Sequence, residues 1–408
     1  MTILTVGQST DYDYYIAPGS INSEIVIQQA IDACFDGDTV DIAPGVYRLS
    51  GHIYPRSNTT IVGEVGTVLK LAPGLPNYLN GRDVTSTEWG NHGATATSGA
   101  AKGMFQIGEK VHVTIKDITI DGSCDDYYKY LLSHLGVGLF NLITAWDSDY
   151  LTFENIYFTQ GANDAIALSS CDYVNMKNCT VNKCGHDGIQ AYNGSNYVIQ
   201  YNTFINRGNS SIHLNKIAGA EVFCNNCSTG AQGGALNAVE LQGEQTSTWI
   251  HHNRIHDINA PGIGEIFVLN PPSFSTALKI YNNIIYSCPA GISIRTTGAN
   301  IYNNIIDDCF FGIDCCSLAT SIDKCIITNI GKTGTGINMG AATTVTNCCF
   351  FGNKLNTTKT IGITNSTMDP GYVDKSARNY ILAPTNVLAT ELLGVTADIT
   401  PGLIEITW

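Results

Sequence analysis

One histidine and two glutamates stand where short β-strands would bring them together. His213 and Glu240 follow the same β-branched position in consecutive copies of a repeated strand, and Glu265 precedes it in the next copy. Neighbouring strands lie about 5 Å apart, so Glu240 would orient the His213 imidazole for acid/base catalysis. Glu240 and Glu265 would lie roughly 8 Å apart, within the ~6.5–9.5 Å between the carboxylates of an inverting glycosidase. We predict catalytic roles for all three; a purely structural His–Glu pair is the alternative.

A second pair of carboxylates lies at the turn that enters the same strands. Asp164 and Asp187 are one repeat apart, and His186 directly precedes Asp187. Two carboxylates about 5 Å apart repel each other, which favours a shared proton or a bound cation. The chemistry requires no cofactor, and Ca²⁺ is the cation that Asp164 and Asp187 would hold. Asp187 is also the substitute catalytic carboxylate if the register of Glu265 differs by one residue. The alternative is turn chemistry, in which both side chains accept backbone hydrogen bonds.

The outward face of these strands carries polar and aromatic side chains suited to sugars. Aromatic rings can stack on the C–H faces of sugars, amides can bind hydroxyls, and cations can bind the carboxylates of uronates. The predicted substrate-binding residues are Trp146, Gln190, Tyr192, Asn215, Lys216, Gln242 and Arg295. An elongated groove of this kind fits a polymer better than a small metabolite, whereas a merely solvated strand face would carry mostly Thr, Lys and Glu.

The strands that must hold these residues form an internal repeat. A β-branched residue recurs every 21 to 27 residues at Ile143, Ile166, Ile189, Ile212, Val239, Ile266, Ile292, Ile313 and Ile337. Short, alternating, β-branched segments at this period are typical of a β-solenoid and exclude a helical repeat. We therefore predict an all-β solenoid of about ten coils, with one strand of every coil in a common outer wall.

A column of asparagines supports the same period. It comprises Asn155, Asn178, Asn202, Asn226, Asn253, Asn283 and Asn304, and Cys325 and Cys348 continue it. Stacked Asn side chains can hydrogen-bond from coil to coil, so we interpret this column as structural.

The whole chain, 1–408, is predicted to be one solenoid domain. Helical periodicity over residues 22–35 predicts a short helix that covers the open first coil, so 12–72 form the N-terminal cap and first coils. Residues 73–137 form a coil with long insertions, 73–103 and 121–137, which we expect to flank the groove. Residues 138–350 are the regular coils and 351–408 a C-terminal cap.

Composition limits the partners of this chain. The net charge is −14 and charged residues make up 14%, which disfavours nucleic acid. The 14 cysteines have no disulfide-scaffold spacing and suit buried filling positions. No apolar stretch is long enough to span a membrane. The first ten residues lack the features of a secretory signal. We expect an extracellular or cell-surface location as a mature domain, and the sequence leaves the oligomeric state open.

The segment IQQAIDACFDGDTVDIAPGVYRL, followed by coils with Asn ladders, resembles the right-handed parallel β-helix of the pectate-lyase-like superfamily. The resemblance covers residues 20–350 and implies that fold. The superfamily includes polysaccharide lyases, polygalacturonase-type hydrolases, mannuronan epimerases and tailspikes. The DPHE motif of the epimerases and the NTD, DD, GHG and RIK series of the polygalacturonases are missing, so no catalytic residue is carried over. The Cys- and Asn-rich style and the DP-x-x-VD ending resemble archaeal disaggregatase-related proteins, which act on a chondroitin-like matrix.

These observations predict an endo-acting enzyme that depolymerises an acidic, uronate-containing polysaccharide, and a chondroitin-like polymer is one candidate substrate. Hydrolysis by carboxylate acid/base residues is the first expectation. Two alternatives stay open: β-elimination by a polysaccharide lyase, and a non-catalytic glycan-binding surface or tailspike-like solenoid.

Overall fold

The computed structural model describes most of the chain. The described residues are 1–72, 103–123, 141–229, 237–243, 245–258, 266–269, 278–296, 298–315, 320–331, 334–340, 342–359, 365–376 and 379–382. The predicted insertions 73–103 and 121–137 lie almost wholly outside them. Residue contacts divide the chain into two compact units, Met1–Ala220 with Thr229–Ala235, and Glu221–Ser228 with Leu236–Trp408. Each unit is a stack of parallel coils.

Each regular coil contains three short strands separated by sharp corners. In one coil of the first unit these are β13 (Ile166–Ser169), β14 (Asp172–Lys177) and β15 (Thr180–Cys184). Single residues in the left-handed region turn the corners, as at Ser170 (φ 51°) and Asn178 (φ 54°). Asn tolerates this conformation better than most residues, which explains why Asn is frequent at corners. The three strands of successive coils build three parallel sheets, called the first, second and third wall.

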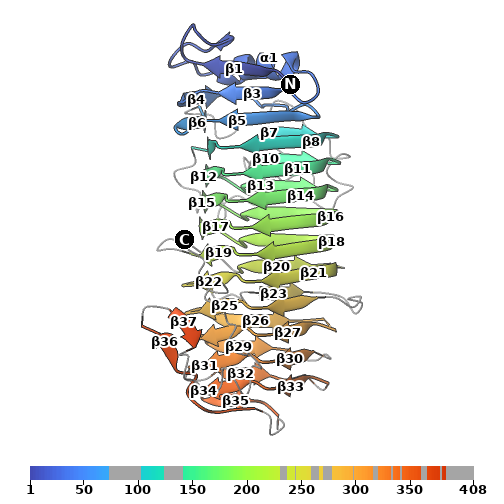
Figure 1. The fold of residues 1–408 in the computed structure, drawn as a ribbon, viewed down its shortest axis with the longest axis vertical. Helices are drawn as coiled ribbons and strands as arrows, with labels where there is room; N and C mark the ends of the chain where they lie inside the picture. Colours follow the sequence, from blue (N-terminus) through green and yellow to red (C-terminus); the bar gives the residue numbers. More distant parts are fainter. Residues whose placement is uncertain are drawn as a thin grey trace. The chain divides into compact units, whose positions relative to one another are not determined.

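The described residues of the first unit form five strands in its first wall and six in its third, and Figure 1 shows these strands stacked coil after coil. The first-wall strands are β7 (Gly103–Gly108), β10 (Asn141–Trp146), β13, the beginning of β16 (Ile189–Gln200) and the beginning of β18 (Ile212–Phe223). The second wall contains β1 (Ile3–Gly7), β2 (Tyr14–Tyr15), β3 (Thr39–Ile42), β5 (Thr59–Gly63), β8 (Val111–Lys116), β11 (Asp149–Glu154), β14 and the end of β16. The third wall contains β4 (Gly45–Leu49), β6 (Thr67–Leu71), β9 (Thr119–Asp121), β12 (Tyr157–Gly161), β15 and β17 (Thr203–Arg207).

The second unit repeats the three walls. Its first wall contains β20 (Val239–Gln242), β23 (Ile266–Leu269), β26 (Ala290–Ile294), β29 (Phe311–Asp314), β32 (Thr335–Asn338) and β35 (Leu355–Thr357). Its second wall contains β21 (Thr246–His251), β24 (Lys279–Tyr281), β27 (Asn300–Tyr302), β30 (Ser321–Asp323) and β33 (Thr344–Thr346). Its third wall contains β19 (Asn226–Ser228), β22 (Arg254–His256), β25 (Ile284–Tyr286), β28 (Ile305–Asp307), β31 (Ile326–Thr328) and β34 (Cys349–Phe351). An antiparallel hairpin, β36 (Tyr372–Asp374) and β37 (Asn379–Leu382), follows.

The predicted β-branched column is confirmed as the inner face of the first wall. Ile143 pairs with Ile166 and Ile166 with Ile189 in the first unit. In the second unit Val239 pairs with Ile266, and the column continues to Ile337. All of these side chains are at most 1% exposed, so the apolar column is the core that holds the wall in register. Each coil contributes one strand to the third wall. The described residues of each unit contain six such strands, so the two units together have twelve coils, whereas about ten were predicted for the chain.

The predicted N-terminal helix is present as α1 (Ser23–Ala33), with Asn22 at its N-cap. Ile27, Ala30 and Ile31 are fully buried and face the first coils. The Glu24 carboxylate accepts hydrogen bonds from the backbone and hydroxyl of Ser50 in the corner after β4. Figure 1 shows α1 beside β1 at the N-terminal end of the first unit.

The asparagine ladder exists, but three of its predicted members are displaced by one residue. Asn155 and Asn178 are exposed and occupy the left-handed corner position just before the ladder. In the second unit the ladder begins at Asn225, not Asn226. The residues in it are Asn225, Asn253, Asn283, Asn304, Cys325 and Cys348, each contacting the next. An amide at this position satisfies backbone groups of two coils inside the core.

None of the described helices is long and apolar enough to cross a membrane.

Candidate active site

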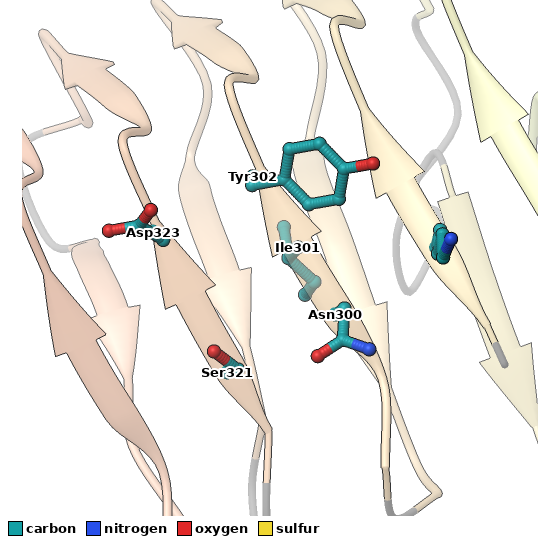
Figure 2. A pocket seen from close by; sticks show the side chains of 6 residues that line it. Asn300, Ile301, Tyr302, Ser321 and Asp323 are labelled. Carbon is teal, nitrogen blue, oxygen red and sulfur yellow. The ribbon is translucent and has the colours of Figure 1, made fainter. Parts of the chain in front are cut away.

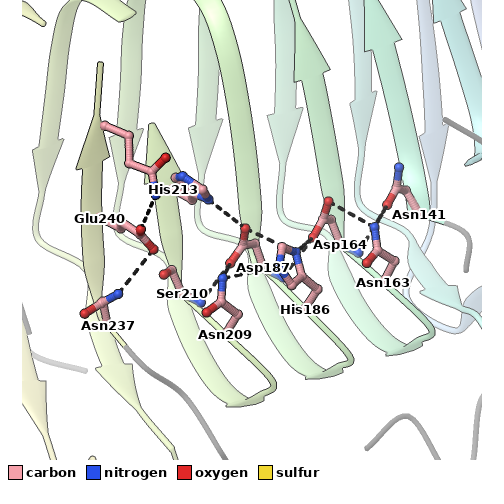
Figure 3. Close-up of polar contacts among 11 residues, drawn as sticks. Asn141, Asn163, Asp164, His186, Asp187, Asn209, Ser210, His213, Asn237 and Glu240 are labelled. Atoms are coloured by element: carbon pink, nitrogen blue, oxygen red, sulfur yellow. Dashed lines mark hydrogen bonds and ion pairs between the residues drawn. The ribbon is translucent and has the colours of Figure 1, made fainter. Parts of the chain in front are cut away.

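A chain of buried polar side chains lines the start of the first wall in the first unit (Figure 3). The Nδ1 atom of His186 lies 2.7 Å from Oδ1 of Asp164 and 3.3 Å from Oδ2 of Asp187. The Nδ1 atom of His213 lies 3.1 Å from the same Oδ2 of Asp187. One carboxylate therefore contacts two imidazoles that come from two coils.

The corner backbone fixes both carboxylates. The backbone N–H of Asp187 donates to Oδ1 of Asp164 over 2.8 Å, and the N–H of Ser210 donates to Oδ1 of Asp187 over 2.8 Å. Each Asp thus accepts a hydrogen bond from the same corner of the next coil, as predicted for turn chemistry. Asn163 and Asn209 add side-chain donors to Asp164 and Asp187 respectively. Both carboxylates are 0% exposed, so neither can touch a polymer directly.

The environments drive the two carboxylates to opposite protonation behaviour. Burial raises the pKa of Asp164, and the His186 imidazole offsets only part of this effect. Burial also opposes the charge on Asp187. Here His186, His213 and the N–H of Ser210 together outweigh burial and lower the pKa of Asp187. Asp187 is therefore the more acidic member of the pair, and a split of this kind is a feature of acid/base sites.

The hydrogen bonds assign a tautomer to His186. Asn209 Nδ2 lies 3.3 Å from Nε2 of His186 and also donates to Asp187. An amide N–H needs an acceptor, so the His186 proton lies on Nδ1, facing Asp164. By the same logic His213 carries a proton on Nδ1, which donates to the Asp187 anion. A carboxylate that holds one tautomer in this way also stabilises the imidazolium that forms when Nε2 accepts a proton.

The carboxylate pair is also the group of described residues best placed to hold a metal ion. Asp164, His186 and Asp187 each offer one ligand atom, and these atoms lie within 4.8 Å of one another. Oδ1 of Asp164, however, already accepts N–H donors from His186 and Asp187. A cation would have to displace these donors, so the observed bonds fit a proton-sharing network better than a Ca²⁺ site.

The predicted binding residues of the first unit lie on the wall near this network. Lys216 is exposed, and its Nζ lies 3.2 Å from the Tyr192 hydroxyl and 5.3 Å from the centre of the Tyr192 ring. Gln190 and Asn215 are partly exposed. Trp146 is also partly exposed, and a Cβ on Gly108 would overlap its indole, so the ring packs directly on the preceding coil. The structure thus combines partly exposed rings, amides and a cation on one wall with His186 and His213.

The remaining predicted residues belong to the second unit. Glu240 is 7% exposed, and Gln242 and Asn237 donate hydrogen bonds to its two oxygens. Arg295 follows β26 and forms an ion pair of 2.8 Å with Asp314. Glu265 lies outside the described residues. The pairing of His213 with Glu240 joins the two units and stays a prediction; the carboxylate that the structure places on His213 is Asp187.

The hydrogen bonds between the corners of successive coils were not predicted from the sequence. Three dipeptides, Asn163-Asp164, His186-Asp187 and Asn209-Ser210, recur at intervals of 23 residues. The sequence points to Asp164, His186 and Asp187 as candidates, whereas Asn163, Asn209 and Ser210 were not predicted. Aligning both residues of each dipeptide at the 23-residue interval would have predicted that the polar corner of one coil contacts that of the next.

Comparisons with known proteins agree with the coiled fold. A family model described as a right-handed β-helix region matches residues 105–263. Among solved structures, the A-module of a mannuronan C-5 epimerase from Azotobacter vinelandii is 14% identical, with a TM-score of 0.57 over 87% of this chain and 96% of that one. A family 28 exopolygalacturonase from Yersinia enterocolitica is 13% identical, with a TM-score of 0.56 over 90% and 78%. PfbA, a surface adhesin of Streptococcus pneumoniae, is 14% identical, with a TM-score of 0.52 over 89% and 92%.

The fold is therefore the predicted right-handed parallel β-helix, and the chain is similar in fold to these solved structures. At these identities the likeness establishes the fold and leaves the reaction to the site itself. A search of curated proteins finds no match to the sequence.

Proposed function

We propose that this protein is an endo-acting enzyme that depolymerises an acidic, uronate-containing polysaccharide on its first wall. The observation that carries the proposal is the hydrogen bond from His213 to Asp187. A fully buried anion holds a histidine on a wall that also carries a partly exposed tyrosine and an exposed lysine. Nε2 of His213 is itself buried in this structure, so the proposal requires that it becomes accessible when a sugar binds and then moves a proton at that sugar, a role that neither fully buried carboxylate can take.

β-Elimination uses these groups most directly. Nε2 of His213 would take the proton from the carbon next to the uronate carboxylate, and Asp187 would stabilise the resulting imidazolium. The released electron pair forms a C=C bond as the neighbouring C–O bond to the leaving sugar breaks, and the leaving oxygen takes a proton from the Tyr192 hydroxyl. The positive charge of Lys216 would face the substrate carboxylate and the developing negative charge.

The structural neighbours support an acidic polymer as the substrate. Mannuronan and the polymer cut by a polygalacturonase are both uronate chains by name. The chain itself carries a net charge of −14, so a uronate polymer must be recognised by local cations such as Lys216 rather than by the overall field. The proposal includes three further points. The substrate is a chondroitin-like polymer, the activity resembles that of disaggregatase-related proteins, and the protein acts outside the cell.

Hydrolysis centred on Glu240 is the second candidate. This candidate is supported by the two hydrogen bonds that Gln242 and Asn237 donate to the Glu240 carboxylate on the first wall of the second unit. Glu240 would then protonate the leaving oxygen while a partner carboxylate, Glu265 in the sequence prediction, activates water. The likeness to an adhesin keeps a non-catalytic glycan-binding role as a third outcome.

Two variants and one product assay separate these functions. Uronate polymers such as polygalacturonate, alginate and chondroitin would be incubated with the wild type, His213→Gln and Glu240→Gln, and products identified by mass spectrometry and near-ultraviolet absorbance. Elimination predicts an unsaturated uronate end, and a loss of about 10²–10⁴-fold in rate for His213→Gln but not Glu240→Gln. Hydrolysis predicts a saturated end and the reverse order of losses.

A matched control comes from the second wall. His112 is an exposed histidine that stacks on Tyr150 at 4.5 Å, and His112→Gln should retain full turnover. Binding of a polymer without any cleavage product by the wild type would contradict the enzymatic proposal and support the glycan-binding role.

A further inference from the structure

The second wall of the second unit contains an open pocket with polar and apolar lining, far along the chain from the candidate active site (Figure 2). Its volume is about 340 Å³, and it is lined by Lys279, Asn300, Ile301, Tyr302, Ser321 and Asp323. The strands β24, β27 and β30 supply these residues, one rung after another.

Strand register arranges the pocket as two parallel rows of outward side chains. Lys279 pairs with Asn300, which pairs with Ser321, and Tyr302 pairs with Asp323 in the second row. Ile301 lies between the rows and is 1% exposed. Because alternate residues of a strand face the same side, the inward Ile301 fixes both rows outward.

The row that contains Lys279 begins with an aromatic platform. Trp249 pairs with Lys279, is 38% exposed, and has the Lys279 ammonium 5.1 Å from its ring centre. Lys279 makes no ion pair with any described residue. In a chain of net charge −14, this partly exposed cation is held in place by a ring rather than neutralised by a carboxylate.

The other end of the pocket offers an acceptor. Oδ1 of Asp323 accepts hydrogen bonds from Thr346 and Asn347 of the next coil, over 2.7 and 2.9 Å. Oδ2 accepts none from the residues that the structure describes. Tyr302 is held by stacking on Tyr281 at 4.9 Å and an interplanar angle of 3°, and Figure 2 shows Tyr302 and Asn300 on the same strand with Ile301 between them. These contacts pre-order the polar groups at the two ends of the pocket.

We propose that this pocket is a secondary binding subsite for a uronate unit of the polysaccharide, separate from the catalytic wall. Lys279 binds the carboxylate, Asn300 and Ser321 bind ring hydroxyls, Asp323 accepts a hydroxyl hydrogen bond, and Trp249 lies against a sugar face at the edge. A neutral sugar satisfies the hydroxyl partners but leaves Lys279 without its anion. The choice of a polymer unit as ligand rests on the proposed function, but the requirement for a carboxylated sugar rests on the pocket alone.

Tryptophan provides a local readout for each site. The chain has 4 tryptophans, so the full-length protein labelled with 5-fluorotryptophan should give a small, assignable set of fluorine resonances. Trp249→Phe identifies the pocket reporter, and Trp146→Phe identifies the reporter on the first wall. The probes are D-galacturonate and, as the neutral match, D-galactose.

The subsite predicts that galacturonate shifts the Trp249 resonance in a saturable manner and that galactose does so at least about tenfold more weakly, since a charge-assisted contact is lost. Lys279→Gln keeps the stem over Trp249 and should weaken the response to galacturonate about tenfold or more. Ser321→Ala should weaken it less. The control is Lys354→Gln, an exposed lysine of the same unit outside the pocket, which should titrate like the wild type.

The proposal is overturned if galacturonate leaves the Trp249 resonance unchanged, if galactose shifts it equally well, or if Lys279→Gln titrates like the wild type. Failure of the proposed function gives a different pattern: no turnover of any uronate polymer, with the Trp249 titration intact. Loss of the Trp249 titration with full turnover of short uronate oligomers would remove only the subsite.

Discussion

The Nδ1 atom of His213 lies 3.1 Å from Oδ2 of Asp187, a carboxylate on the preceding coil that is 0% exposed. The buried anion cannot reach a substrate, but it determines which nitrogen of the histidine keeps its proton. The side chain of His213 is 11% exposed, whereas its Nε2 atom is buried, so the Asp187 charge acts on a histidine that lies just beneath the surface of the wall. The predictions for Asp187 and Asp164 follow from this role of a buried carboxylate in orienting a histidine.

Asp187→Asn should destabilise the protein more than Asp164→Asn. Both carboxylates accept hydrogen bonds from N–H donors, but Asp187 contacts two imidazoles, His186 and His213, in addition to the N–H of Ser210 and the amide of Asn209, whereas Asp164 contacts one imidazole, that of His186. An amide nitrogen at this position would face a donor, and a buried polar group left without a partner costs about 1–3 kcal/mol. Chemical denaturation of both variants measures the difference, and equal losses would contradict the assignment of Asp187 as the more acidic member.

The pH dependence of these two variants should have opposite signs. The lowered pKa of Asp187 gives stability that is present above the unfolded value of about 3.9 and is lost as the pH falls through the folded pKa. The raised pKa of Asp164 gives stability that is present below about 3.9 and is lost as the pH rises through the folded pKa. Relative to the wild type, Asp187→Asn should therefore recover in acid, and Asp164→Asn should improve as the pH rises. Melting temperatures from acid to neutral pH test this.

Removal of divalent cations should leave the network unchanged. Oδ1 of Asp164 is already bonded to two N–H donors, so Ca²⁺ has to displace them before it can bind. We expect the same melting temperature with Ca²⁺ and with EDTA. A Ca²⁺-dependent rise that disappears in Asp164→Asn would instead establish the Asp164–Asp187 metal site predicted from the sequence.

Tyr192→Ala and Trp146→Ala should each weaken binding of a uronate polymer. An aromatic ring stacked on a sugar contributes on the order of 1 kcal/mol, which corresponds to about fivefold in affinity. Tyr192→Ala should have the larger effect because it also removes the partner of Lys216. The control is Tyr173→Ala on the second wall, where Tyr173 stacks on Tyr150 at 4.6 Å. Unchanged affinity in both wall variants would exclude this wall as the groove.

Asn283→Ala should strongly destabilise the second unit. The Asn283 amide donates to the backbone of Ile250 and to Asn304, and its oxygen accepts from Asn253. Truncation leaves several buried groups without partners, at about 1–3 kcal/mol each. Asn300→Ala, on the exposed face of the neighbouring coil, should change the free energy of unfolding by less than about 0.5 kcal/mol. Similar values for the two variants would show that the ladder does not stabilise the core.

The sequence by itself determined the coil and its register. A β-branched residue at every coil, with alternation on both sides, allows only one face of each strand to enter the core, so Ile143, Ile166 and Ile189 had to pair as they do. The helix at residues 23–33 was predictable for the same reason, because its apolar residues share one face. Position on the wall was therefore readable for Tyr192 and Lys216.

Only the tertiary structure decided which of these side chains touch. Single left-handed residues at the corners set the direction of every side chain near a turn, and no periodic pattern encodes that direction. For this reason Asp187, predicted as a metal ligand and substitute carboxylate, became the partner of His213, and Arg295 formed an ion pair with Asp314. The asparagine ladder shifted by one residue at Asn225 for the same cause. Contacts between coils depend on the local backbone, whereas the repeat depends only on the burial of apolar side chains.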